Sequence, residues 1–201
     1  MITMSSLLQR AALALALACG SASASQIFHV DVNTTALSGS GFLDFAVNGR
    51  AGAPLASATV SKLSGAFGAE ADRGGDVVGA IPAGFTLTSS AGDNWLTQAV
   101  AFGGMFSFDI SIGGDFETVA GSDGATFSVG LFDALFSQYA VAAQFVTLPG
   151  LGGIPASLTP GADPALATVA EVRADVPEPA ALALFLAALL AAGAAVRRRQ
   201  P

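Results

Sequence analysis

Residues 105–112 read MFSFDISI, and this stretch shows the pattern that decides the fold. Apolar side chains occupy the even positions from 106 to 112, and Ser107, Asp109 and Ser111 stand between them. Because successive side chains of a β-strand point to opposite faces of a sheet, a period of two predicts a strand with one apolar and one polar face. The stretch therefore predicts a half-buried strand that covers a hydrophobic core.

Shorter versions of the same alternation recur along the chain. They occupy residues 26–32, 42–48, 58–63, 85–89, 125–133 and, less regularly, 165–173. Clusters of Gly, Ser, Asn, Asp and Pro separate many of them, and these residues favour turns; examples are residues 38–41, 73–76, 113–114 and 121–124. Many short strands without a long helical pattern predict an all-β ectodomain, an antiparallel β-sandwich of a jelly-roll-like kind.

Two segments do not follow the alternation. Residues 134–148 read ALFSQYAVAAQFVTL, whose alanines permit a helix while its Phe, Tyr and Val residues permit strands. The sequence leaves this segment open between the two. The Pro-containing residues 149–164 are predicted to form a loop.

The C-terminal residues 176–201 read VPEPAALALFLAALLAAGAAVRRRQP and divide into three parts. The first part is Pro177, Glu178 and Pro179. Each proline fixes its own φ, and Pro179 also disfavours a helical Glu178, so we expect Glu178 to be extended and exposed. A stiff, extended segment of this kind binds to an enzyme with little cost of ordering.

The second part, residues 180–196, consists entirely of Ala, Leu, Phe, Val and one Gly. As a helix it would span roughly 26 Å, slightly less than the roughly 30 Å hydrocarbon core of a bilayer. The third part is Arg197, Arg198 and Arg199, which would hold the far end on the cytoplasmic side and compensate for the difference by snorkelling. Residues 180–196 are thus predicted to form a single transmembrane helix, with the preceding domain outside the cytoplasm.

This three-part tail resembles the PEP-CTERM sorting signal, and the resemblance covers about the last 26 residues. It implies an exported protein of an exopolysaccharide-producing Gram-negative bacterium, anchored transiently in the inner membrane. It also implies processing by an exosortase-type enzyme, with transfer or release of the domain. The alternative is a plain membrane anchor whose prolines only mark the helix start. Residues 29–48, HVDVNTTALSGSGFLDFAVN, are similar to the start of a recurring β-rich domain of unknown activity in PEP-CTERM proteins.

The N-terminus has the features of a secretory signal peptide. Arg10 provides a positive charge, and residues 11–18 form an apolar run that is too short to span a membrane. Ala22 and Ala24 form an A-x-A cleavage site for signal peptidase. The mature chain is therefore predicted to begin at Ser25.

The single cysteine, Cys19, lies within this predicted signal peptide. A lipoprotein is the alternative, but a lipobox places Leu three residues before the cysteine, where this chain has Ala16. After signal peptidase cleavage the chain can form no disulfide, and it has no thiolate nucleophile and no Cys-based metal site.

The predicted organisation is a signal peptide at residues 1–24, the β-sandwich ectodomain at 25–176 and the sorting signal at 177–201. The ectodomain has 152 residues, the size of one ordinary domain. It contains four basic and fourteen acidic residues, a net charge of −10 with its histidine neutral. Such a surface repels nucleic acid and anionic lipid, so neither is an expected partner.

Residues that could form a catalytic site are scarce. His29 is the only histidine, and the chain has no G-x-S-x-G nucleophile elbow. We expect His29 to face solvent from a strand or to pair with Asp31. A glycosidase needs only two carboxylates at a suitable separation. Fourteen acidic residues form many such pairs, so this condition does not distinguish an enzyme from a protein without activity. The sequence therefore predicts no enzyme activity and no cofactor.

Calcium is one ligand that the sequence leaves open. Asp115, Glu117 and Asp123 lie in residues 113–124, GGDFETVAGSDG, where glycine-rich turns can bring hard oxygen ligands together. The spacing matches no EF-hand loop, and acidic residues in turns are commonly solvated.

Carbohydrate is the other open ligand. Trp95 and Tyr139 are the chain's only Trp and Tyr, and they are the candidate sugar contacts. A place in the core is the competing expectation for Trp95. The sequence as a whole favours an exported, non-catalytic protein of the cell surface or extracellular matrix. The alternative is a carbohydrate-binding module for the producer's own polysaccharide, and a glycosidase-type enzyme comes third.

Overall fold

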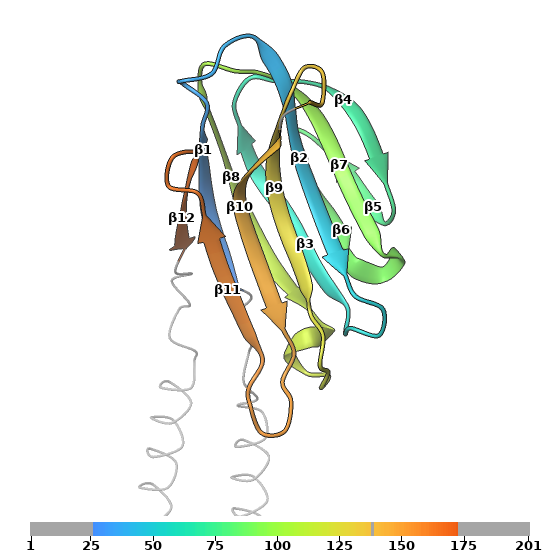
Figure 1. Cartoon of the computed structure of the whole chain (residues 1–201). Helices are drawn as coiled ribbons and strands as arrows, with labels where there is room; N and C mark the ends of the chain where they lie inside the picture. The colour runs from blue at the N-terminus through green and yellow to red at the C-terminus, as the bar shows by residue number, and fades with distance from the viewer. Residues whose placement is uncertain (1–25, 138, 173–201) are drawn as a thin grey trace, which may run out of the picture. The chain divides into compact units, whose positions relative to one another are not determined.

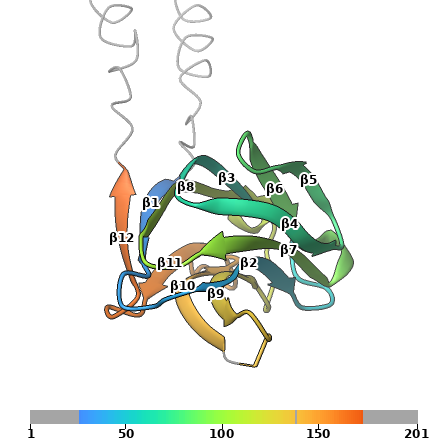
Figure 2. The same cartoon turned by 90° about the horizontal axis from the view of Figure 1, so that it is seen from above.

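Figure 1 shows the computed structural model of the chain, which describes residues 26–137 and 139–172. The described residues form twelve β-strands and two short 3-10 helices, η1 (Ser89–Ala91) and η2 (Asp115–Glu117). The strands make two antiparallel sheets of six strands each, which pack face to face (Figure 2). The predicted antiparallel β-sandwich is confirmed.

The two sheets differ in which strands they contain. The first comprises β1 (Gln26–Asn33), β3 (Ala56–Ser64), β5 (Val77–Ala80), β6 (Gly84–Thr88), β8 (Met105–Gly114) and β12 (Ala167–Val172), in the order β12-β1-β8-β3-β6-β5. The second comprises β2 (Ser40–Gly49), β4 (Phe67–Gly74), β7 (Asp93–Ala101), β9 (Ala125–Asp133), β10 (Tyr139–Leu148) and β11 (Ser157–Ala162), in the order β11-β10-β9-β2-β7-β4. Every pairing between neighbouring strands is antiparallel, so the loops gather at two ends of the sandwich.

The inner faces of the two sheets form the core. In β8 the apolar residues at positions 106, 108, 110 and 112 are buried, while Ser107 and Ser111 are partly exposed on the outer face, as the alternation predicts. Phe45 of the second sheet makes edge-to-face contacts with Phe85 and Phe108 of the first, at centroid distances of 5.1 and 5.3 Å. Aromatic contacts across the core thus help to hold the sheets together.

Three edge strands differ from the sequence predictions or were absent from them. Residues 149–164 were predicted as loop but contain β11, an edge strand that tolerates Pro160 because an edge need not use every backbone N–H. β4 and β5 were not predicted; they are also edge strands, and residues 75–76 between them belong to the predicted turn. Of the segment left open between helix and strand, residues 139–148 form β10.

Candidate functional site

Trp95 lies on the outer face of the second sheet, not in the core. It stands opposite Ala46 of β2, while its neighbour Leu96 points inward and is fully buried. The indole N–H donates a 2.9 Å hydrogen bond to Oδ2 of Asp72, and the ring lies across Gly74, where an added Cβ would come within 2.2 Å of it. The contacts with β4 therefore hold the indole half-buried at the surface, and the expectation that Trp95 lies in the core is wrong.

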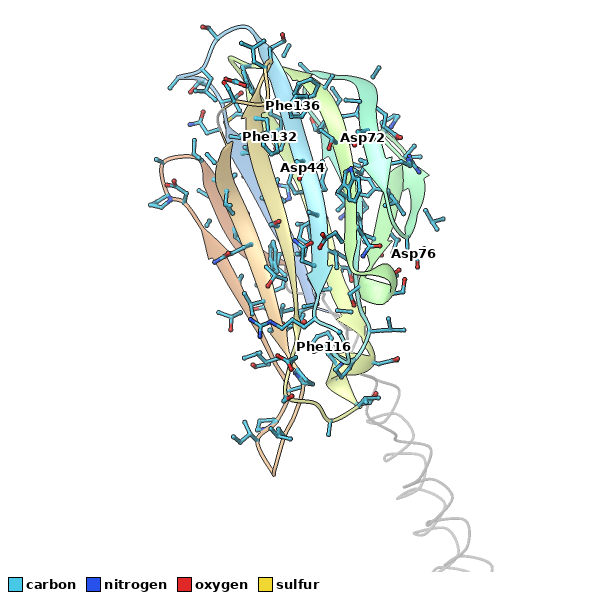
Figure 3. The ribbon with its side chains drawn as sticks, turned by 45° about the vertical axis from the view of Figure 1, so that its right-hand side comes forward. Asp44, Asp72, Asp76, Phe116, Phe132 and Phe136 are labelled. Atoms are coloured by element: carbon cyan, nitrogen blue, oxygen red, sulfur yellow. The ribbon has the colours of Figure 1, made fainter. Side chains whose placement is uncertain are left out.

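Polar side chains from three strands lie beside Trp95. Thr97 of β7 stands in register with Asp44 of β2 on one side and with Asp72 of β4 on the other. Its hydroxyl donates a 2.6 Å hydrogen bond to Oδ1 of Asp44. Figure 3 shows Asp44 and Asp72 on this face. Trp95, Asp44 and Asp72, with the buried Thr97 between the two carboxylates, form what we call the β7 surface.

The β7 surface is acidic. Burial raises the pKa of Asp44, the hydrogen bond from Thr97 lowers it, and the charge of Asp72 adds to the rise. In the described part of the chain, each basic side chain pairs with a carboxylate other than Asp44 or Asp72. The surface therefore combines an aromatic ring with carboxylate oxygens that accept hydrogen bonds, a combination suited to ligands rich in hydroxyl groups.

Tyr139 begins β10, paired with Phe132 of β9. Strands β9 and β2 lie between β10 and β7, so the structure does not bring the two candidate sugar contacts together. Nothing in the sequence pattern predicted Asp44, Asp72 or Thr97 as neighbours of Trp95, because strand register alone brings them together.

A small cavity of about 300 Å³ opens near the aromatic side chains at one end of the second sheet. Its lining includes Phe102, Leu131, Phe132 and Asp133. Just outside it, Phe136 stacks on Phe42 with ring centroids 4.1 Å apart, and Figure 3 labels Phe132 and Phe136 there. Phe136 also contacts Phe132 at a centroid distance of 5.4 Å, so these rings form an aromatic cluster that is partly exposed and lies outside the core.

His29 belongs to a polar cluster on the outer face of the first sheet. Its Nδ1 lies 2.6 Å from Oδ1 of Asp109, and its Nε2 lies 3.4 Å from Oδ1 of Asp31. The expected pairing with Asp31 exists, but Asp109 is the nearer partner. Ser107 donates its hydroxyl hydrogen to Asp31 at 2.6 Å, and Lys62 lies 2.7 Å from the other oxygen of Asp109. Two carboxylates thus flank the imidazole, an arrangement that favours its protonated form and gives it no nucleophile to activate.

The pKa directions in this cluster follow from these contacts. The hydrogen bond to Asp109 raises the pKa of His29 above its ordinary value of 6.5, against the opposing effect of burial, and the charges of both carboxylates add to the rise. Burial is the largest single influence on the pKa of Asp109 and acts to raise it, but the hydrogen bonds and charges of Lys62 and His29 together hold that pKa below its ordinary value.

We expect the melting temperature to fall modestly as the pH rises from about 6 to about 8, because protonated His29 stabilises the fold only below its folded-state pKa. The stabilisation is complete below the unfolded-state pKa of about 6.5 and is lost as the pH passes through the raised, folded-state value. His29→Gln should flatten the profile in thermal melts across this range. Ser111→Ala, on β8 outside the cluster, should keep the parent's slope, and an equal slope in His29→Gln and parent would contradict the assignment.

The three candidate calcium ligands lie near the start and end of the β8–β9 connection. Asp115 and Glu117 belong to η2, while Asp123 accepts a hydrogen bond from Ser122 and lies 3.4 Å from a guanidinium nitrogen of Arg50. No three His, Cys, Asp or Glu side chains within residues 26–137 and 139–172 lie close enough together to hold a metal ion. The structure therefore does not gather these carboxylates into a metal site.

The predicted sorting and cleavage residues lie outside the described residues. They are Ala22, Ala24, Ser25, Pro177, Glu178, Pro179, Arg197, Arg198 and Arg199, together with the predicted helix at residues 180–196. Among the residues that the structure does describe, no helix is long and apolar enough to cross a membrane. The signal peptide and the transmembrane helix stay predictions.

Comparison with known proteins identifies the tail. A family model for the PEP-CTERM protein-sorting motif matches residues 175–199, which include Glu178 and its two flanking prolines. No curated protein and no solved structure matches the chain. The chain therefore carries a PEP-CTERM sorting signal, which marks a protein that is exported, held at the membrane in transit and processed by an exosortase.

Proposed function

We propose that this protein is a non-catalytic component of the cell surface or extracellular matrix, delivered there by exosortase processing. The observation that carries the proposal is the sorting motif at residues 175–199, directly after a β-sandwich whose last described strand ends at Val172. A sorting signal of this kind directs the domain out of the cell, so the work of the mature protein is done outside the cytoplasm.

The chemistry of the outer faces supports a role without catalysis. His29 is the general base that a hydrolase would be expected to use, and it is flanked by Asp109 and Asp31. Ser107, the hydroxyl side chain bonded to this cluster, donates its hydrogen to Asp31. An imidazolium between two carboxylates serves better to fix strand positions than to accept a proton from a substrate.

A second candidate function is binding of the producer's own polysaccharide. Trp95 favours it, because its indole is fixed on an outer face beside Thr97 and Asp72 and is not part of the core. Sugars present apolar C–H faces that pack on aromatic rings and hydroxyl groups that donate to carboxylates. The acidic β7 surface repels acidic polymers, so the expected ligand is a neutral or amino-bearing polysaccharide.

One experiment tests both candidates. Processed protein recovered from the cell surface is incubated with the producer's polysaccharide, and both the molar mass of the polymer and its co-sedimentation with protein are measured. We expect the molar mass to stay constant, and shortening of the polymer would overturn the non-catalytic role. If the β7 surface binds polysaccharide, Trp95→Ala should weaken co-sedimentation roughly tenfold or more, the loss typical of a central aromatic contact. Val78→Ala, an exposed site on the other sheet, is the matched control.

A further inference from the structure

One end of the sandwich exposes several large apolar side chains on its loops. It is the end where β1 begins and β12 ends, since Ile27 pairs with Val172. The exposed side chains there include Leu55 before β3, Val119 between β8 and β9, and Leu151 and Ile154 between β10 and β11, with exposed fractions of 46, 49, 54 and 72%. We call this surface the apolar end.

The loops of the apolar end touch one another. The Phe116 N–H donates to the carbonyl of Leu55 at 3.3 Å, and the Gly121 N–H donates to the carbonyl of Gly150 at 3.2 Å. Gly121 also lies so close to Pro54 that an added Cβ would come within 2.9 Å of it. The exposed side chains are therefore carried by one connected group of loops and not by independent flaps.

The β10–β11 hairpin extends beyond the other loops of this end (Figure 1). At its tip the N–H of Leu151 donates to the carbonyl of Ile154 at 3.1 Å, and the N–H of Ile154 donates to the carbonyl of Leu151 at 3.0 Å. Gly152 and Gly153 between them have φ values of 60° and 90°, which glycine adopts without strain. The tight turn fixes two apolar side chains at the outermost point, so little entropy is lost when they enter another medium.

The short chain between β12 and the predicted anchor indicates that the apolar end faces the membrane. β12 ends at Val172, and the apolar run predicted to anchor the chain begins at residue 180. The seven residues between them can span at most about 25 Å when fully extended. While the anchor lies in the membrane, the end of β12 cannot move farther than that from the bilayer.

We propose that, during this anchored stage, the apolar end rests in the interface of the lipid bilayer with the tip of the β10–β11 hairpin inserted. Burying apolar side chains at the interface provides the driving force. The inference rests on the proposed anchoring by residues 180–196. Asp115, Glu117 and Asp123 lie on the same loops and outnumber Arg50, which pairs with Asp123, so these loops repel anionic headgroups and the lipid partner is zwitterionic.

The test uses the anchored chain purified from membranes of cells that lack exosortase and reconstituted into phosphatidylcholine vesicles. Trp95→Phe removes the native tryptophan, and one new tryptophan is placed by Ile154→Trp or, as the matched control, by Leu135→Trp. Leu135 is also highly exposed, but it lies in the β9–β10 connection at the opposite end of the sandwich. Unchanged melting temperatures show that both variants keep the fold.

We expect the emission of Ile154→Trp to shift to shorter wavelength and to lose more than half of its intensity when the lipid chains are brominated. Leu135→Trp should keep a water-like emission that the brominated lipid does not quench. Replacing half of the lipid with phosphatidylglycerol should reduce the quenching of Ile154→Trp. Equal quenching of the two variants, or none in either, overturns the proposal. Extraction with alkaline carbonate distinguishes failure of the anchoring from failure of the docking. A chain that carbonate extracts from the vesicles is not anchored by residues 180–196. A chain that is retained, but whose Ile154→Trp emission is not quenched, is anchored without docking.

Discussion

Replacing Phe45 by alanine is expected to reduce the free energy of unfolding by about 3–5 kcal/mol, the range for removing a large aromatic side chain from a core. Phe45 is fully buried in β2 and contacts Phe85 and Phe108 edge to face, at 5.1 and 5.3 Å. Because those two rings belong to the opposite sheet, the cavity would lie between the sheets, where neither can collapse without moving the other. A loss of this size is a large part of the stability of an ordinary domain.

Urea denaturation of the processed protein measures this effect. The urea concentration at the midpoint of unfolding should fall. The slope of the unfolding free energy against urea concentration should stay constant, since the surface exposed on unfolding hardly changes. Leu135→Ala is the control, because Leu135 is 83% exposed and its loss should alter stability by no more than about 0.5 kcal/mol. Similar midpoints for the two variants would show that Phe45 is not part of a tightly packed core.

The central strands of this fold could be predicted because each has one buried and one solvated face. In β8, β1 and β2 every second side chain is buried, and the sequence shows the same period. A strand in the middle of a sandwich has this environment along its whole length, so its pattern depends little on details of the neighbouring strands.

The edge strands could not be predicted in the same way. β4 has no buried residue in any of its eight positions, so its sequence, FGAEADRG, is under no pressure to alternate. β11 contains Pro160, which a central strand would exclude. Such strands form because a neighbouring strand offers unpaired backbone groups, information that lies elsewhere in the chain.

The candidate sites show the same division between local and distant information. The outward position of Trp95 has a local signal in the sequence. Leu96 and Val100 occupy even positions of β7 and point into the core, so Trp95, at an odd position, points outward. The positions of Asp44 and Asp72 beside Thr97 have no local signal in the sequence, because these residues come from other strands and are brought together only by strand register. His29 likewise contacts Asp109, 80 residues away in the sequence, because β1 pairs with β8.

Replacing Glu178 by alanine is expected to leave the protein in the inner membrane with its tail uncleaved. Glu178 lies in the matched sorting motif between two prolines, which favour an extended backbone that a processing enzyme can bind at low entropic cost. The substitution leaves residues 180–196 and the arginines unchanged, so insertion into the membrane should proceed normally. The defect should therefore appear at cleavage.

Membrane fractionation and intact mass measure the outcome together. The parent chain should be recovered from the cell surface as a species that begins at Ser25 and has lost its apolar tail, whereas Glu178→Ala should be recovered from the inner membrane with residues 180–196 intact. Neutral replacements of Arg197, Arg198 and Arg199 provide a contrasting control. They should act earlier, by weakening the stop that holds the helix in the bilayer. Cleavage and delivery of Glu178→Ala like the parent would remove the central residue from the sorting hypothesis and would favour an ordinary membrane anchor, because a plain anchor depends on the apolar run and the arginines and not on a carboxylate before them.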